Sequence, residues 1–378
     1  MRARTIAWSG LGAAALFGAV GGAWLLTLPS GTAATTSPPI DDQETNALLA
    51  ALKPPRRQRP LIAIVGINDA TETTDYLMPY GVLRRAGVAD VKLLATGAGP
   101  VTLFPVLKVE PDSTTAQFDA QHPDGADYVL VPAMSRDDDP AALGWIAAQA
   151  RKGATIVGVC AGAKVVAAAG LLDGRRATTH WYYLEELRRK HPEVQYVPNR
   201  RYVIDRGIAT TTGITASMPM ALTLIEAIAG RAKAEAVANE LGVPGWDARH
   251  DSSAFTFTRP FAAAAILNSL AVWNRERLGL ELEPGVDEVT LALVADAWSR
   301  TYRSHAVAWS TSGRAIETRN GLRVLPEAVA ASWPPERRLT AAGRKPGLAL
   351  DETLNAIAAR YGGRTADFVA MQLEYPRR

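Results

Sequence analysis

The only cysteine of the chain, Cys160, lies in the short segment Gly158-Val159-Cys160-Ala161-Gly162. A continuous apolar run that predicts a buried strand precedes it, and an Ala- and Val-rich run that favours a helix follows it. Such a strand, turn and helix form a nucleophile elbow, in which the side chain is pushed outward and only small neighbours such as Gly158 and Gly162 fit. Free N–H groups and the helix dipole favour the thiolate there. Cys160 is therefore a candidate nucleophile; the alternative is a buried structural cysteine.

The composition excludes several other kinds of site. A single cysteine forms neither an intramolecular disulfide nor a thiolate zinc site, and the five histidines lack metal-ligand spacing, so we expect no metal and no cofactor. The formal net charge is only +3 and the basic residues form no stripe, so we expect no nucleic-acid partner. With 48% hydrophobic and 21% charged residues, the 378-residue chain is typical of a folded protein with one large domain or two ordinary ones.

Apolar runs alternate with helix patterns between residues 60 and 244, which predicts a domain over that range. The alternation indicates an α/β fold, a flavodoxin-like doubly wound parallel sheet whose functional site lies at the carboxyl ends of the strands. Cys160 follows one of these strands. The predicted strands are 61–66, 91–95, 127–132, 154–159 and 207–211, and the predicted helices are 75–86, 140–151 and 215–241.

Two segments resemble the ThiJ/PfpI family, which belongs to the class I glutamine-amidotransferase-like superfamily. The first is Val157-Gly158-Val159-Cys160-Ala161-Gly162-Ala163, and the second runs through Gly170-Leu171-Leu172-Asp173-Gly174 to Thr178-Thr179-His180-Trp181. The chain looks most like isonitrile hydratases and the sensor-like domains of AraC-type regulators, although we expect no helix-turn-helix module here. The resemblance implies a flavodoxin-like domain built around a cysteine nucleophile.

The resemblance assigns roles to three side chains by position. Cys160 matches the nucleophile, Asp75 matches an acidic residue that approaches the sulfur, and His180 matches a histidine that in some members lies nearby. A carboxyl group beside a thiol can shuttle its proton during addition to an electrophile. Because a carboxylate repels a thiolate, we expect Asp75 to be protonated whenever the thiolate forms. His180 acts as a base or orients a substrate; alternatively, it packs at the edge of a helix.

The expected oxyanion hole departs from the family pattern. Family members usually have glycines where this chain has Pro132-Ala133-Met134, and often Thr or His where it has Ala161. The backbone N–H groups of Ala133, Met134 and Ala161 remain as expected oxyanion donors, without side-chain help. These departures favour a non-catalytic domain, whereas the retained Cys160 and its partners favour an enzyme.

Residues 1–29 predict a signal anchor. The first four residues include two arginines, Arg2 and Arg4. Residues 5–28 then carry no charge over a length that can span a bilayer as a helix. The arginines favour a cytoplasmic N-terminus, so we expect a single-pass membrane protein whose folded part is extracytoplasmic. A cleaved signal peptide, which would leave a secreted or periplasmic protein, is the alternative. Residues 30–59 predict a linker.

The C-terminal third predicts an incomplete repeat of the first domain. Residues 288–327 repeat the order found in 75–112: an acidic residue, an amphipathic helix, a strand, a turn and an extended piece that ends before proline. We expect a degenerate α/β unit over 285–378 that packs on the first domain as an intramolecular pseudo-dimer; the alternative is ordinary α/β similarity. A helical connector is expected over 245–284, with a helix at 261–278.

Two functions are consistent with these observations. One is a cysteine-dependent hydrolase, hydratase or glyoxalase-like enzyme that acts on a small electrophile or amide. The other is a non-catalytic domain that senses a small ligand or the oxidation of Cys160, or that serves as a scaffold. The sequence leaves open whether the protein is an enzyme.

Overall fold

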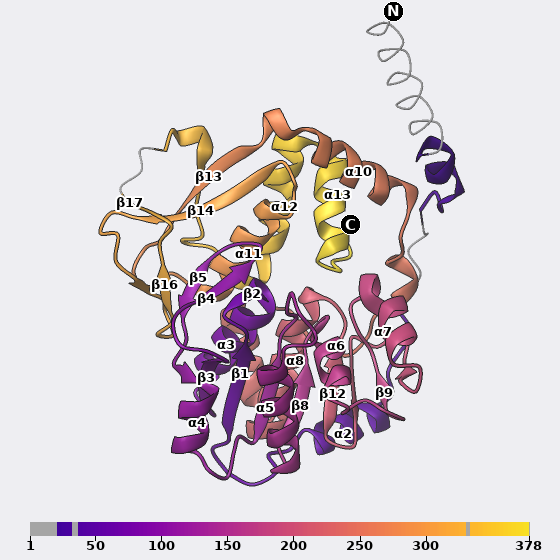
Figure 1. The fold of residues 1–378 in the computed structure, drawn as a ribbon, viewed down its shortest axis with the longest axis vertical. Helices are drawn as coiled ribbons and strands as arrows, with labels where there is room; N and C mark the ends of the chain where they lie inside the picture. The colour runs from indigo at the N-terminus through magenta and orange to yellow at the C-terminus, as the bar shows by residue number, and fades with distance from the viewer. Residues whose placement is uncertain (1–20, 32–36, 330–332, 378) are drawn as a thin grey trace, which may run out of the picture.

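The computed structural model describes residues 21–31, 37–329 and 333–377. A seven-stranded sheet in the order β11-β12-β8-β7-β1-β3-β6 lies at the centre of the first unit (Figure 1). All neighbouring strands are parallel except β11 and β12. This confirms the expected α/β fold with a largely parallel sheet. The strands are β1 (Leu61–Gly66), β3 (Asp90–Ala95), β6 (Ser113–Thr114), β7 (Tyr128–Val131), β8 (Thr155–Gly158), β11 (Tyr202–Asp205) and β12 (Ile208–Thr211).

Helices cover both faces of this sheet, which is why its strands are apolar throughout. In β1, Ile62 and Ile64 pack into the core beneath α3 and α8, whereas Leu61, Ala63 and Val65 pack into the core beneath α4, α5 and α6. The helices are α3 (Thr73–Ala86), α4 (Thr115–Gln121), α5 (Pro140–Arg151), α6 (Gly162–Ala168), α7 (Leu184–Lys190), α8 (Ser217–Ala229) and α9 (Arg231–Leu241).

Two features of this unit differ from the sequence prediction. The helix expected over 215–241 is interrupted at Gly230, whose φ of 84° lies outside the helical region. Strand β11 was not predicted; it pairs with β12 across Arg206 and Gly207. Both turn residues have positive φ, 49° and 80°, which is the backbone of a tight two-residue hairpin.

The second unit contains a four-stranded parallel sheet in the order β17-β14-β13-β18. The prediction of a helix over 261–278 was wrong in its second half, because α10 ends at Leu270 and Glu276–Glu281 forms β13. Leu278 and Leu280 of β13 are buried, and six residues of the strand pair with β14. The elements are α10 (Arg259–Leu270), β13 (Glu276–Glu281), α11 (Glu288–Ser299), β14 (Ser304–Ser310), β17 (Ala328–Val329), β18 (Arg338–Leu339), α12 (Pro346–Tyr361) and α13 (Gly363–Gln372).

The two units contact each other through the segments that the sequence comparison matched. Helix α3 packs on α11, where a Cβ at Gly81 would lie 2.6 Å from side-chain atoms of Glu288 and Val289. A mixed sheet crosses the junction, and in it Val109 pairs with its sequence counterpart Val324 in antiparallel register. Contact between equivalent residues is what a two-fold axis produces. The strands of this sheet are β2 (Asp69–Glu72), β4 (Val101–Phe104), β5 (Lys108–Glu110), β15 (Ile316–Glu317) and β16 (Arg323–Leu325).

The N-terminal region is described in part. Within the described ranges, no helix is both long and apolar enough to cross a membrane, and residues 1–20, which hold most of the expected anchor, lie outside those ranges. Residues 21–27 are helical. In the expected linker, α2 (Asp42–Ala51) docks on the first unit, where Arg200 pairs with Glu44 and the Tyr128 hydroxyl donates to the Leu52 carbonyl.

Candidate functional site

Cys160 lies between β8 and α6 at the carboxyl end of the central sheet. Its φ of 58° falls in the left-handed region, which is uncommon for a residue other than glycine. The Gly162 N–H closes the turn by donating to the Val159 carbonyl at 2.7 Å. A Cβ at Gly162 would lie 1.9 Å from the Val131 carbonyl oxygen, and one at Gly158 would lie 3.0 Å from the backbone of Ala163. The segment therefore has the strained, tightly packed geometry of a nucleophile elbow.

Threonine hydroxyls hold the elbow from two neighbouring segments. The Cys160 N–H donates to Thr211 Oγ1 at 2.9 Å, and Thr179 Oγ1 donates to the Cys160 carbonyl at 3.2 Å. Thr211 ends β12, and Thr179 lies in the Thr-Thr-His-Trp segment. The sequence analysis did not assign these two side chains, although the threonine pairs 178–179 and 210–211 were visible in it. They fix the Cys160 backbone from both sides.

Asp75 is completely buried in the first turn of α3. Its Oδ2 accepts a hydrogen bond from the Ala133 N–H at 3.1 Å, and its Oδ1 has no hydrogen-bond partner among the described residues. Burial, followed by the nearby charge of Glu72, raises the pKa of Asp75 well above its usual range. Burial at this position therefore favours the protonated form of Asp75. Pro79 cannot donate to the Asp75 carbonyl, so the helix lacks one backbone bond at this turn.

Glu72 connects this carboxyl group to the second unit. Its side chain caps α3 by accepting from the Asp75 N–H at 2.6 Å, and its Oε1 pairs with Arg300 Nη2 at 2.7 Å. Arg300 follows α11 and also contacts Asp296, at 2.8 Å from Nε to Oδ2. The sequence analysis missed Glu72, Asp296 and Arg300, because their contacts join positions as many as 228 residues apart. A cation from the second unit thus faces the acidic group beside Asp75.

The Cys160 thiol is protonated at rest. Burial, followed by the charges of Asp75 and Glu72, raises the pKa of Cys160 well above its ordinary value, and the Ala161 N–H opposes this shift only in part. The N–H at the helix start therefore acts in the expected direction, but the loss of water and the nearby acidic groups outweigh it.

The three expected oxyanion donors have different surroundings. The Ala133 N–H is occupied by Asp75, and the Ala133 carbonyl accepts from the Glu72 N–H at 2.9 Å. Met134 lies opposite Thr71 in an isolated antiparallel bridge. Ala161 N–H faces the sulfur. Of these donors, Ala161 is the one adjacent to the nucleophile.

His180 is buried and is bound on both ring nitrogens. Its Nδ1 accepts from the Tyr182 N–H at 3.2 Å, which leaves Nε2 to carry the proton and donate to the Gln372 carbonyl at 2.9 Å. Burial lowers the pKa of His180. The structure therefore brings His180 to the end of α13, where it holds the backbone of the C-terminal segment, rather than into a hydrogen bond with Cys160.

The C-terminal segment closes the edge of the sheet beside the elbow. Glu374 is buried; its carboxylate accepts from the Gly213 N–H and pairs with His250 Nε2 at 2.9 Å. Its carbonyl accepts from Thr215 Oγ1 at 2.8 Å. The Glu374 charge also contributes to raising the pKa of Cys160. The second unit thus places a carboxylate near Cys160 and Arg300 near Asp75.

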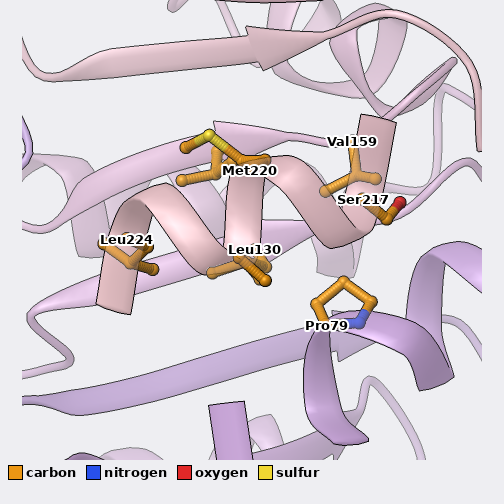
Figure 2. A pocket seen from close by; sticks show the side chains of 8 residues that line it. Pro79, Leu130, Val159, Ser217, Met220 and Leu224 are labelled. Carbon is orange, nitrogen blue, oxygen red and sulfur yellow. The ribbon is translucent and has the colours of Figure 1, made fainter. Parts of the chain in front are cut away.

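A small apolar cavity lies behind the elbow, between the sheet and helices α3 and α8. Figure 2 shows Val159, Pro79, Met220 and the Ser217 hydroxyl around it. Val159 precedes the nucleophile, and Pro79 lies one turn beyond Asp75. Among the described residues, no group of His, Cys, Asp and Glu side chains could hold a metal ion.

Comparisons with known proteins match the region that contains this site. The model of the DJ-1/PfpI family matches residues 62–227. An isonitrile hydratase from Pseudomonas putida is 34% identical over 172 residues, which cover 44% of this chain and 72% of that protein. The HTH-type transcriptional regulator CdhR from Pseudomonas aeruginosa is 40% identical over 86 residues, which cover 23% of this chain and 25% of the regulator. The crystal structure of Drosophila melanogaster DJ-1beta has a TM-score of 0.45 and 23% identity, and the match covers 50% of this chain and 100% of that one.

Proposed function

Because the chain belongs to the DJ-1/PfpI family, we propose that it is a cysteine-dependent hydratase in which Cys160 attacks a small carbon electrophile of the isonitrile class. The observation that carries the proposal is the strained elbow, which presents Cys160 in one electrostatic environment with a protonated Asp75. The similarity to an isonitrile hydratase over the same region supports the substrate class.

The raised pKa values of both groups favour a neutral proton relay. The sulfur bonds to the terminal carbon of the isonitrile while that carbon takes the Asp75 proton and Asp75 takes the thiol proton. Water then adds to the resulting thioimidate carbon, and the C–S bond breaks. The products are an N-formyl amine and the regenerated thiol, so the net reaction adds one water. No standing thiolate is needed, which suits a buried cysteine.

The test is hydration of a small alkyl isonitrile by the full chain, followed by appearance of the formamide. Cys160→Ala should abolish turnover, and Asp75→Asn should lower kcat by about 10²–10⁴-fold because the relay is lost. Asp69→Asn is the matched control, since Asp69 lies close in sequence but its side chain is 67% exposed. Equal activity of the Asp75 and Asp69 variants would contradict the relay, and unchanged activity of the Cys160 variant would contradict the function.

The burial of Cys160 favours a second candidate, a non-catalytic ligand-sensing domain, because it restricts access of a substrate to the sulfur. Only 3% of Cys160 is exposed, and the segment around Glu374 closes the adjacent edge of the sheet. A sensor would show no turnover, but a small ligand would raise its unfolding temperature. Turnover of any small electrophile that depends on Cys160 would exclude the purely sensory function.

The proposal also includes an N-terminal anchor and an extracytoplasmic folded part. It is supported by the uncharged stretch at residues 5–28 and the two arginines before it. Recovery of the mature protein from membranes with an intact N-terminus supports the anchor. A mature soluble protein that lacks the first 30 or so residues supports the cleaved signal peptide instead.

A further inference from the structure

Helix α10 carries no charge beyond its first residue. Its sequence, Arg-Pro-Phe-Ala-Ala-Ala-Ala-Ile-Leu-Asn-Ser-Leu, contains a single charge, Arg259, and two further polar residues, Asn268 and Ser269. In a soluble protein, a helix with so few polar residues is normally buried on most sides, because water would otherwise contact apolar surface.

The inner face of α10 is buried against α13. Phe261 and Ala264 form a small core with Phe368, whose ring lies 5.1 Å from that of Phe261. Asn268, the polar residue of this face, meets Thr365 of α13. This packing accounts for only one side of the helix.

The outer face of α10 is exposed to solvent. Ile266, Leu267 and Leu270 are 41%, 61% and 62% exposed. Pro260 and Ala263 lie on the same side of the helix, about two turns and one turn before Leu267. These five residues are called the α10 apolar face. Its spacing of three and four residues makes one continuous stripe along the helix. Exposed apolar stripes of this kind mark contact surfaces rather than ordinary solvent-facing helices.

The N-terminal segment leaves the folded body beside the first turn of α10. The Arg259 guanidinium donates to the carbonyls of Leu25, Leu26 and Leu28, and its N–H donates to the Pro29 carbonyl. The ring of Trp24 lies 6.2 Å from that of Phe257, just before the helix. The single charge of α10 thus fixes the end of the uncharged stretch 5–28 next to the apolar face, and Figure 1 shows residues 21–31 on the same side of the molecule as α10.

The far end of α10 has the residues that favour a membrane surface. Trp273 is 81% exposed and Val272 is 53% exposed, and Arg275 and Arg277 are exposed directly after them. Tryptophan prefers the boundary between lipid headgroups and acyl chains, and arginine pairs with lipid phosphates. The uncharged N-terminal segment thus lies at one end of the α10 apolar face, and exposed aromatic and basic residues lie at the other end.

We propose that the α10 apolar face lies on the lipid bilayer from which the N-terminal segment emerges. The inference rests on the proposed anchor. A bilayer matches a stripe without charges, whereas a protein partner is usually bound with some polar contacts along its rim. Because the segment 5–28 ends beside the α10 apolar face, its insertion into a bilayer would hold the face at the lipid surface. The second unit would then rest on the membrane through α10.

The test places a polarity-sensitive fluorophore on single cysteines of the full chain, in a Cys160→Ala background, bound to vesicles of phosphatidylcholine and phosphatidylglycerol. Leu270→Cys samples the face, and Val329→Cys in β17 is the matched control, with 61% exposure against 62% and a place far from α10 in Figure 1. Vesicles with brominated acyl chains should quench the label at 270 by roughly twofold or more, and the label at 329 should be unaffected.

The outcomes distinguish a failure of the α10 apolar face to contact lipid from a failure of the N-terminal anchor. If the protein floats with vesicles but the label at 270 is not quenched, the face does not touch lipid and the inference fails while the anchor stands. If the protein does not float, the anchor fails; quenching at 270 by added vesicles would then support the face alone, and its absence would overturn it. Self-quenching between labels at 270 without lipid quenching would overturn the inference in favour of a second copy.

Discussion

Cys160 occupies a turn in which backbone strain and close packing occur together. Its positive φ is stabilised by hydrogen bonds from both sides, and Gly162 lies against the Val131 carbonyl. Strain of this kind costs about 1–3 kcal/mol and persists only where the surrounding structure enforces it. The same enclosure removes water from the thiol and raises its pKa. The Cys160 thiol is therefore held in a fixed position, and its burial favours the protonated form.

Gly162→Ala should destabilise the protein by about 2–4 kcal/mol, because a Cβ at 1.9 Å from a backbone oxygen forces the elbow to move. Urea unfolding measures the change. Gly144→Ala is the control: Gly144 lies in α5, a Cβ there would meet nothing within 4 Å, and alanine in a helix is favourable by about 1 kcal/mol. Similar effects at both positions would show that the elbow is not tightly packed.

At the scale of elements, the contact of α3 with α11 controls the charge around Asp75. Glu72 caps α3, and Arg300 at the end of α11 pairs with both Glu72 and Asp296. All three side chains are at most 13% exposed, so the loss of the cation would leave carboxylates buried without a partner. One helix of each unit thus contributes to one electrostatic group.

Arg300→Gln should destabilise the fold by about 3–5 kcal/mol, since removing one member of a buried ion pair leaves an uncompensated charge. Arg231→Gln, at an exposed pair with Glu235, should cost no more than about 1 kcal/mol. Thermal unfolding of the two variants distinguishes them. The Arg300 loss should be larger at neutral pH than near pH 4, because burial raises the pKa of Asp296 to about 7 and loss of the cation raises it further, so folding of the variant requires proton uptake at neutral pH but much less near pH 4. A pH-independent loss would contradict the electrostatic explanation.

The sequence predicted the helices and strands more completely than the contacts between the two units. Cys160 could be assigned because the elbow around it is a local pattern, whereas Asp75 was assigned from the resemblance to the ThiJ/PfpI family. Strand β13 was missed because no Gly or Pro separates it from α10, so residues 271–278 appeared to continue the helix. Arg300 and Glu374 could not be found, because each reaches the first unit only after the two units have packed.

At the scale of the whole molecule, we propose that the second unit takes the place of a partner subunit. Val109 pairs with its counterpart Val324, and α3 packs on α11, which the sequence comparison matched to it. The second unit also supplies Glu374 near Cys160 and Arg300 as the partner of Glu72. The site is thereby completed within one chain.

The protein should therefore be a monomer in mild detergent, with a protein mass near 40.3 kDa by light scattering corrected for bound detergent. Gly81→Val should weaken the junction, because its Cβ would lie 2.6 Å from Glu288 and Val289. Gly363→Val is the control, since a Cβ there meets nothing within 4 Å. A stable dimer of the unaltered chain whose interface includes α3 would contradict the pseudo-dimer.

The most direct test of the central claim compares the pH dependence of Cys160 alkylation with isonitrile hydration in the unaltered chain and in Asp75→Asn. Asp75 is protonated in the proposed relay, so Asp75→Asn exchanges one neutral group for another and removes only the transferable proton. Hydration should therefore fall by about 10²–10⁴-fold, whereas the pH dependence of Cys160 alkylation should stay close to that of the unaltered chain. Loss of hydration with unchanged alkylation would establish Asp75 as a proton relay rather than a structural residue. If both rates fall together, or if hydration is unchanged, the relay is contradicted.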